Sequence, residues 1–186
     1  MNAGLPASRR LALVGYRGTG KSTVGRIVAG RTGRPFVDAD AALEARFGES
    51  VRSIFERHGE PVFRDREERV LLELTAGPAA VIATGGGAVL REANRNALRR
   101  FGLVVWLTAD PETLAGRLRS SPSAVAGRPA LTAAGTLAEV ADLVRAREPL
   151  YRDVADAEVS TVGRSPAEVA GAVLAVWVQG SPRLDE

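Results

Sequence analysis

Residues 15–22 read Gly-Tyr-Arg-Gly-Thr-Gly-Lys-Ser, which is the pattern G-x-x-x-x-G-K-S of a phosphate-binding P-loop. The apolar run 11–14 precedes this loop, and Val24, Ile27 and Val28 follow it with the spacing of a helix face. In such a strand–loop–helix unit, glycines let backbone N–H groups turn towards phosphate oxygens, and the positive end of the helix faces the same anion. The stretch therefore predicts a nucleotide phosphate site.

Two side chains of this loop carry most of the expected chemistry. Lys21 can reach the β- and γ-phosphates, and the Ser22 hydroxyl can hold Mg²⁺. Of the 25 basic residues in the chain only Lys21 is a lysine, which favours a phosphate-binding role over a glycine-rich turn that fits the pattern by chance. The predicted nucleotide-binding residues of the loop are Gly18, Thr19, Gly20, Lys21, Ser22 and Thr23.

Composition limits the function classes. The 186 residues fit one domain, with 45% hydrophobic and 25% charged residues. Without cysteine, and with one histidine, neither a disulfide nor a His/Cys zinc site can form. Residues 1–10 lack the apolar core of a signal peptide, and no apolar run has the length of a membrane span, so we expect a cytoplasmic protein that does not bind membranes.

The charge balance favours a small anionic substrate over a nucleic acid. The sequence pI is about 10.1, but the net charge is only +3 and the arginines are scattered along the chain. Aromatic residues make up 5% of the sequence, fewer than a basic patch interleaved with aromatics would give. Nucleic-acid binding is therefore the weakest of the functions considered.

Apolar runs alternate with helix-length segments throughout. We expect strands at 11–14, 35–37, 80–83, 103–107 and 158–162, and helices at 41–47, 50–58, 60–76, 91–101, from 111, at 136–147 and from 166 to 177. This alternation predicts a three-layer α/β/α fold with a five-stranded parallel sheet. Residues 120–133 read as a mobile loop, and residues 180–186 as a frayed tail.

Acidic residues and glycines follow two of the expected strands. Asp38 and Asp40 come after the second strand, where open α/β sheets place ligands; they suit Mg²⁺ and a substrate hydroxyl, although one could simply cap the next helix. Gly85, Gly86 and Gly87 end the third strand, and close backbone approach to a ligand would explain them better than a flexible turn.

The remaining candidates are weak on local pattern alone. Arg64 lies in a charged run that is typical of a solvated helix face, and Arg147 could serve the end of its own helix. Arg128 lies in the irregular loop, where an arginine can stabilise phosphoryl charge when a site closes, or can simply be solvated. His58, before Gly59, fits a capping or surface role better than catalysis.

Taken together in order, these motifs resemble the shikimate kinase family over nearly the whole chain. The motifs that carry the resemblance are Gly15 to Thr23, Asp38-Ala39-Asp40, Phe63-Arg64, Gly85-Gly86-Gly87-Ala88-Val89, Arg128-Pro129-Ala130-Leu131 and Arg147-Glu148-Pro149-Leu150-Tyr151. The resemblance implies a P-loop fold like that of nucleoside monophosphate kinases, with a closing lid at about 119–133. It implies ATP-dependent phosphorylation of the shikimate 3-hydroxyl, with Mg²⁺, in aromatic amino-acid biosynthesis.

The resemblance also implies roles for single residues. Asp40 would bind the ring hydroxyls and orient or deprotonate the nucleophile, Arg64 and Arg147 would hold the carboxylate, and Gly86, flanked by Gly85 and Gly87, would approach the ring. On the nucleotide side the implied residues are Ser22 and Asp38 for Mg²⁺, Arg128 for the transferring phosphate and Arg117 for the adenine.

Two other functions remain as alternatives. One is another small-molecule P-loop kinase, such as a gluconate kinase-like enzyme, and the other is a nucleotide-binding module without catalytic activity. The triple glycine with Arg64 and Arg147 argues against the first. The joint presence of four residues argues against the second: Asp40, Arg64, Arg128 and Arg147. We expect a monomer that binds shikimate and ATP.

Overall fold

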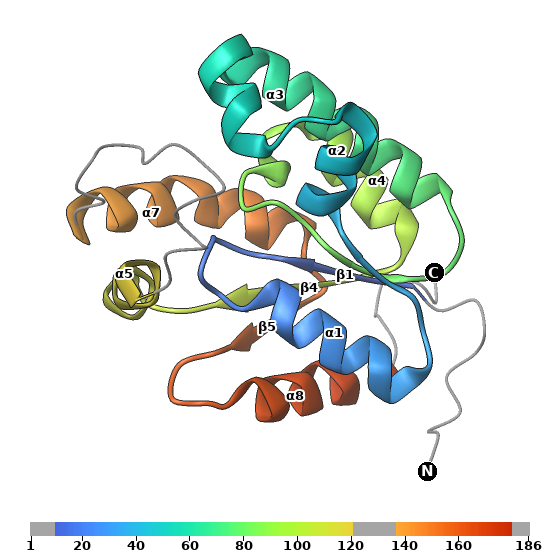
Figure 1. Cartoon of the computed structure of the whole chain (residues 1–186). Coiled ribbons are helices and arrows are strands. Elements are labelled where there is room, and N and C mark those ends of the chain that lie inside the picture. Colours follow the sequence, from blue (N-terminus) through green and yellow to red (C-terminus); the bar gives the residue numbers. More distant parts are fainter. Residues whose placement is uncertain (1–9, 121–136, 180–186) are drawn as a thin grey trace.

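The computed structural model describes residues 10–120 and 137–179. Within these ranges five parallel strands form one sheet in the order β2-β3-β1-β4-β5 (Figure 1). The strands are β1 (Leu11–Val14), β2 (Phe36–Asp38), β3 (Val81–Ala83), β4 (Leu103–Thr108) and β5 (Ala157–Ser160). The predicted α/β fold with a five-stranded parallel sheet is confirmed.

Helices cover both faces of this sheet, with α1 and α8 on one side and α3, α4 and α7 on the other (Figure 1). The helices are α1 (Lys21–Thr32), α2 (Ala39–Phe47), α3 (Val51–Ala76), α4 (Glu92–Phe101), α5 (Pro111–Ser120), α7 (Leu137–Val154) and α8 (Pro166–Gln179), with a 3-10 turn η1 (Ala88–Leu90) after β3. No helix in the described ranges is long and apolar enough to cross a membrane.

The sequence of the central strand β1 is apolar without interruption because both of its faces are buried. Leu11 and Leu13 belong to the core that α1 and α8 close, whereas Ala12 and Val14 belong to the core on the side of α3, α4 and α7. All four side chains are completely buried. Because both faces of the sheet are covered, alternation between apolar and polar residues is absent.

Side chains next to two of the expected helix starts cap the helices. Asp110 Oδ1 accepts a hydrogen bond from Thr113 N at 2.7 Å at the start of α5, and Glu168 Oε2 accepts one from Ser165 N at 2.7 Å at the start of α8. Hydrogen bonds from Thr113 lower the pKa of Asp110, and those from Ser165 lower the pKa of Glu168. The capped helices fix the loops that leave β4 and β5.

One predicted helix boundary needs correction, and another is confirmed. The helix expected at 136–147 is α7, which continues past Pro149 to Val154, so Arg147 does not end it. Tyr151 and Val154 are buried in the core, and this packing stabilises the turn beyond the proline. The break expected between residues 58 and 60 is confirmed, because Gly59 has a non-helical φ of 81° and divides α3 into two helical parts at a kink.

Part of the predicted lid and the predicted tail cannot be placed. Residues 119 and 120 belong to α5, whereas residues 121–133, with Arg128, lie outside the described residues. The tail predicted at 180–186 also lies outside them.

Candidate active site

The phosphate-binding loop leaves the carboxyl end of β1, where the strand order reverses between β3 and β4. Gly15 passes so close to β4 that a Cβ there would collide with the Leu107 carbonyl oxygen. Gly20 forms the N-cap of α1 with a φ of 89°, and no side chain caps this helix. The first turn of α1 therefore presents its backbone N–H groups and positive dipole end to the loop, as an anion site requires.

Lys21 lies inside this loop. Its Nζ donates to the carbonyl oxygens of Gly15 at 2.7 Å and Tyr16 at 2.9 Å, and the residue is 8% exposed. Thr19 Oγ1 donates to the same Tyr16 oxygen at 2.8 Å and tightens the turn. The ammonium group is thus held where it can meet phosphate oxygens on the loop.

Ser22 and Asp38 meet at the base of the site. Ser22 Oγ donates to Asp38 Oδ2 at 2.5 Å, while Asp38 Oδ1 accepts from the backbone N–H groups of Asp40 at 3.1 Å and Ala41 at 3.3 Å. Asp38 therefore caps α2 and faces Ser22 at the same time, so the capping and ligand roles coexist. A hydroxyl beside a carboxylate fits Mg²⁺, which binds through few protein oxygens together with phosphates and water.

No cluster of three or more acidic, histidine or cysteine side chains that could hold a metal occurs in residues 10–120 and 137–179. The pair Ser22 and Asp38 cannot complete a coordination shell alone, so a metal held by them would need further oxygen ligands.

Asp40 reaches the same edge of the sheet as the triple glycine. Strands β2 and β3 pair in parallel with Asp38 opposite Ala83, so Asp40 and Gly85 both follow the strands at their carboxyl ends. Asp40 is partly buried in the first turn of α2. Its position fits the predicted contact with a ligand in the crevice at this edge.

Gly86 lies between the phosphate-binding loop and α7. Its carbonyl oxygen accepts hydrogen bonds from Tyr151 Oη at 2.5 Å and Arg147 Nη1 at 3.3 Å, both on α7. A Cβ on Gly86 would lie 3.0 Å from Arg17 N. The buried glycine stretch is therefore packed between the phosphate-binding loop and α7, and the close approach expected from the glycines is present between backbones.

Arg64 packs against the next glycine. It is 7% exposed, and a Cβ on Gly87 would collide with its guanidinium group. Arg64 Nη1 donates to Glu67 Oε2 at 2.6 Å, and Nε and Nη2 donate to Glu60 Oε1 at 3.1 and 2.8 Å. Burial alone would lower the pKa of Arg64, but the charges and hydrogen bonds of Glu67 and Glu60 outweigh it and raise the pKa, so Arg64 is charged.

The local interpretation of Arg64 as a solvated surface residue is wrong, because the charged run on α3 turns one arginine inward. Sequence reasoning also missed Tyr151, whose hydroxyl holds Gly86, and the glutamates that orient Arg64. The available signal was spacing: Glu60 and Glu67 lie four residues before and three after Arg64 on one helix face.

Arg117 lies beside the phosphate-binding loop. It bridges the phosphate-binding loop and the end of β5, donating to Gly18 O at 3.2 Å and to Thr161 O and Oγ1, each at 2.9 Å. His58 is exposed and pairs with Glu49 at 3.2 Å, as its predicted surface role requires.

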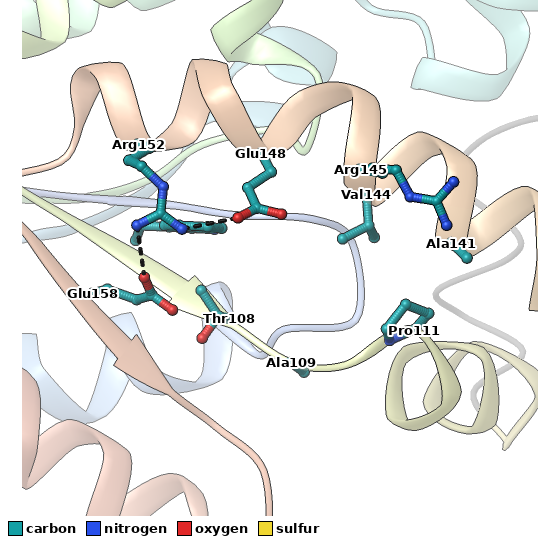
Figure 2. Close-up of a pocket in the computed structure, with 10 residues that line it drawn as sticks. Thr108, Ala109, Pro111, Ala141, Val144, Arg145, Glu148, Arg152 and Glu158 are labelled. Atoms are coloured by element: carbon teal, nitrogen blue, oxygen red, sulfur yellow. Dashed lines mark hydrogen bonds and ion pairs between the residues drawn. The ribbon is translucent and has the colours of Figure 1, made fainter.

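A cavity of about 290 Å³ lies elsewhere, between α7 and the ends of β4 and β5 (Figure 2). Figure 2 shows Arg152 reaching towards Glu148 and Glu158 on its wall. None of the predicted site residues in the described ranges lines this cavity. We therefore assign the active site from the converging side chains rather than from cavity size.

Comparisons with known proteins show the family of the chain. The family model described as shikimate kinase matches residues 17–177. The chain belongs to the shikimate kinase family. It is 46% identical to a shikimate kinase of Symbiobacterium thermophilum, over 88% of this chain and 93% of the relative, and 45% identical to one of Pseudomonas fluorescens, over 94% and 99%.

Solved structures give the same family and a more distant fold relative. Shikimate kinase from Acinetobacter baumannii in complex with shikimate superposes with a TM-score of 0.86 at 37% identity, covering 94% of this chain and 95% of that one. A gluconokinase from Sinorhizobium meliloti reaches a TM-score of 0.61 at 18% identity over 96% and 97%, which shows a shared fold alone. The predicted resemblance to shikimate kinases is confirmed.

Proposed function

We propose that this member of the shikimate kinase family transfers the γ-phosphoryl group of ATP to the 3-hydroxyl of shikimate, forming shikimate 3-phosphate for aromatic amino-acid biosynthesis. The observation that carries the proposal is the position of the buried stretch Gly85 to Gly87. It lies directly beside the phosphate-binding loop and is contacted by Arg64 from α3 and Arg147 from α7. An acceptor held there would lie next to the phosphates.

The acceptor contacts follow from charge and geometry. Arg64 and Arg147 are the proposed ligands of the shikimate carboxylate, since planar guanidinium groups recognise a carboxylate in a bidentate manner that lysine cannot copy. Asp40 is proposed to bind the ring hydroxyls and to orient the attacking oxygen. Gly86 completes the wall beside the ring, because any side chain there would press on the Arg17 backbone.

The nucleotide contacts are proposed from the phosphate-binding loop. Residues 18–23 would surround the phosphates, with Lys21 reaching the β- and γ-phosphates and Arg117 beside the adenine. Mg²⁺ held by Ser22 and Asp38 would neutralise phosphate charge. Arg128, which lies outside the described residues, is proposed to reach the transferring phosphate when the lid closes. We further propose that the enzyme is a cytoplasmic monomer that binds no nucleic acid.

A coupled ADP-release assay with shikimate and gluconate side by side tests the proposal. We expect ADP release that depends on shikimate and Mg²⁺, with no turnover of gluconate. The gluconokinase fold relative is too distant to favour gluconate, so turnover of gluconate without turnover of shikimate would refute the assignment. Nucleotide binding without turnover of either compound would instead favour the inactive module.

A further inference from the structure

Arg17 occupies a position of the phosphate-binding loop at which the G-x-x-x-x-G-K-S motif accepts any residue. It nevertheless lies next to the glycine stretch that is proposed to hold the acceptor. A Cβ added to Gly86 would come within 3.0 Å of Arg17 N, which places this residue directly against the glycine stretch. Gly86 in turn carries the hydrogen bonds from Arg147 and Tyr151. Arg17 is therefore one of the loop residues that border the proposed acceptor pocket, and its backbone approaches Gly86 more closely than those of the two residues before it.

Arg17 is partly buried, and its guanidinium group lacks the carboxylate partners that the buried Arg64 has. Its Nε is buried, and within the described ranges no group accepts a hydrogen bond from it and no carboxylate pairs with Arg17. Arg64, by contrast, is matched by Glu60 and Glu67. A buried, unpaired donor on a charged group is costly, and a bound anion would remove that cost.

Tyr16 brings Arg17 and Arg147 to one aromatic ring. The guanidinium carbon of Arg17 lies 6.0 Å from the centre of the Tyr16 ring, and that of Arg147 lies 5.7 Å from the same centre. Tyr16 is 2% exposed, so the contact is shielded from water. A ring compensates two cations only in part, whereas an anion between them attracts both.

We propose that Arg17 binds the carboxylate of the acceptor together with Arg147, as a third arginine of the carboxylate site. This inference rests on the proposed function and adds to it a residue of the phosphate-binding loop. It links the two substrates, because the acceptor carboxylate would then be held by the same loop that holds the phosphates of ATP. The other anion within the site, the transferring phosphoryl group, is the alternative that the experiment separates.

The substitution Arg17→Met removes the charge and the donors while keeping a long side chain. We expect it to raise the KM for shikimate by roughly tenfold to a hundredfold, as for a lost charge-assisted hydrogen bond, with the KM for ATP within about twofold of the wild type. Arg17→Lys should restore part of the affinity, since lysine keeps the charge without the planar fork. Arg69→Met, at an exposed position of α3, is the control for net charge and should change neither KM.

The methyl ester of shikimate identifies the anion. If Arg17 binds the carboxylate, the ester should show the same KM with the wild type and with Arg17→Met. A fall in kcat of equal size for acid and ester would assign Arg17 to the phosphoryl group and overturn the inference, as would an unchanged KM for shikimate. A lower melting temperature of Arg17→Met with both KM values raised would show that Arg17 only stabilises the packing of Tyr16, and it would also overturn the inference. Absence of shikimate turnover by the wild type would instead refute the proposed function itself.

Discussion

The phosphate side of the site takes nearly all its groups from residues 15–23, whereas the acceptor side draws on α2, α3, the stretch after β3 and α7. The first is a backbone structure that glycines and one helix start create locally. The second exists only when distant elements pack, because Arg64 and Arg147 meet at the glycine stretch from different helices. Substitutions on the acceptor side should therefore affect shikimate without affecting ATP, whereas substitution of Lys21 in the loop should slow the chemistry.

Lys21→Met should give the largest effect. Lys21 is the cation placed among the loop carbonyls, and it is expected to stabilise charge on the transferring phosphate. We expect kcat to fall by a factor on the order of 10²–10³, about 2.7–4 kcal/mol, by analogy with a lost oxyanion donor. Steady-state kinetics measure the fall. Shikimate binding, followed by titration calorimetry, should stay near the wild-type value, and an equal loss of shikimate affinity would contradict the separation of the two sides.

Gly87→Ala should affect the acceptor side alone. The added Cβ would collide with the guanidinium group of Arg64, whose hydrogen bond to Glu67 resists its displacement. Overpacking of this kind costs about 1–3 kcal/mol, so the KM for shikimate should rise by roughly fivefold to a hundredfold. Kinetics with each substrate varied in turn measure the split, and the KM for ATP should stay unchanged.

Gly30→Ala is the matched control for that substitution. Gly30 lies within α1, and nothing lies within 4 Å of the Cβ that would be added. The alanine should stabilise the protein by about 0.4–1 kcal/mol and leave both KM values unchanged. If Gly30→Ala weakened shikimate binding as much as Gly87→Ala does, the clash at Arg64 would not be the cause.

The parts of the molecule that form locally can be predicted from the sequence, whereas the parts that need distant elements to pack cannot. The loop, the five strands and the caps at Asp110 and Ser165 follow from local spacing, because each depends on residues that are close in the chain. Arg64 could not be found that way: a charged helix face is usually solvated, and only the packing of Gly87 against α3 shows that this arginine is buried. Its role came from the family resemblance.

The boundary of α7 shows the second limit of sequence reasoning. A proline usually ends a helix, so the prediction stopped at Arg147. The helix continues to Val154 because Tyr151 and Val154 fill the core on the face of the sheet that α3, α4 and α7 cover. Burial of those side chains outweighs the missing hydrogen bond at Pro149, and burial is a tertiary effect that local propensity does not contain.

Tyr151→Phe should give a moderate effect. It removes the hydrogen bond to Gly86 O and keeps the ring, which stacks on Trp106 at 5.7 Å. Arg147 still donates to the same oxygen, so the glycine stretch should hold its place. We expect the free energy of unfolding to fall by about 0.5–1.5 kcal/mol, measured by urea denaturation. A fall beyond about 3 kcal/mol would show that Tyr151 fixes the stretch by itself.

Glu49→Gln should give the smallest effect, and it acts through pH. Glu49 joins the start of α3 to the rest of that helix through Arg57, His58 and Arg66. Hydrogen bonds from Arg66 and His58 lower the pKa of Glu49 below its ordinary value of 4.5. A carboxyl group whose pKa is lowered by folding contributes stability above its unfolded pKa and loses it as pH falls through the folded value.

The wild type should therefore exceed Glu49→Gln in unfolding free energy near neutral pH, and the difference should shrink in acid as Glu49 becomes protonated. Urea denaturation at several pH values measures it. Glu168→Gln is the matched variant on α8, which packs with α1 on the phosphate side, since hydrogen bonds from Ser165 lower the pKa of Glu168 in the same way. Glu49 is paired with residues of α3, the helix that carries Arg64. Glu49→Gln should therefore weaken shikimate binding, whereas Glu168→Gln should leave it unchanged. Equal shikimate KM values for the two variants would show that the acceptor side does not depend on how α3 is anchored.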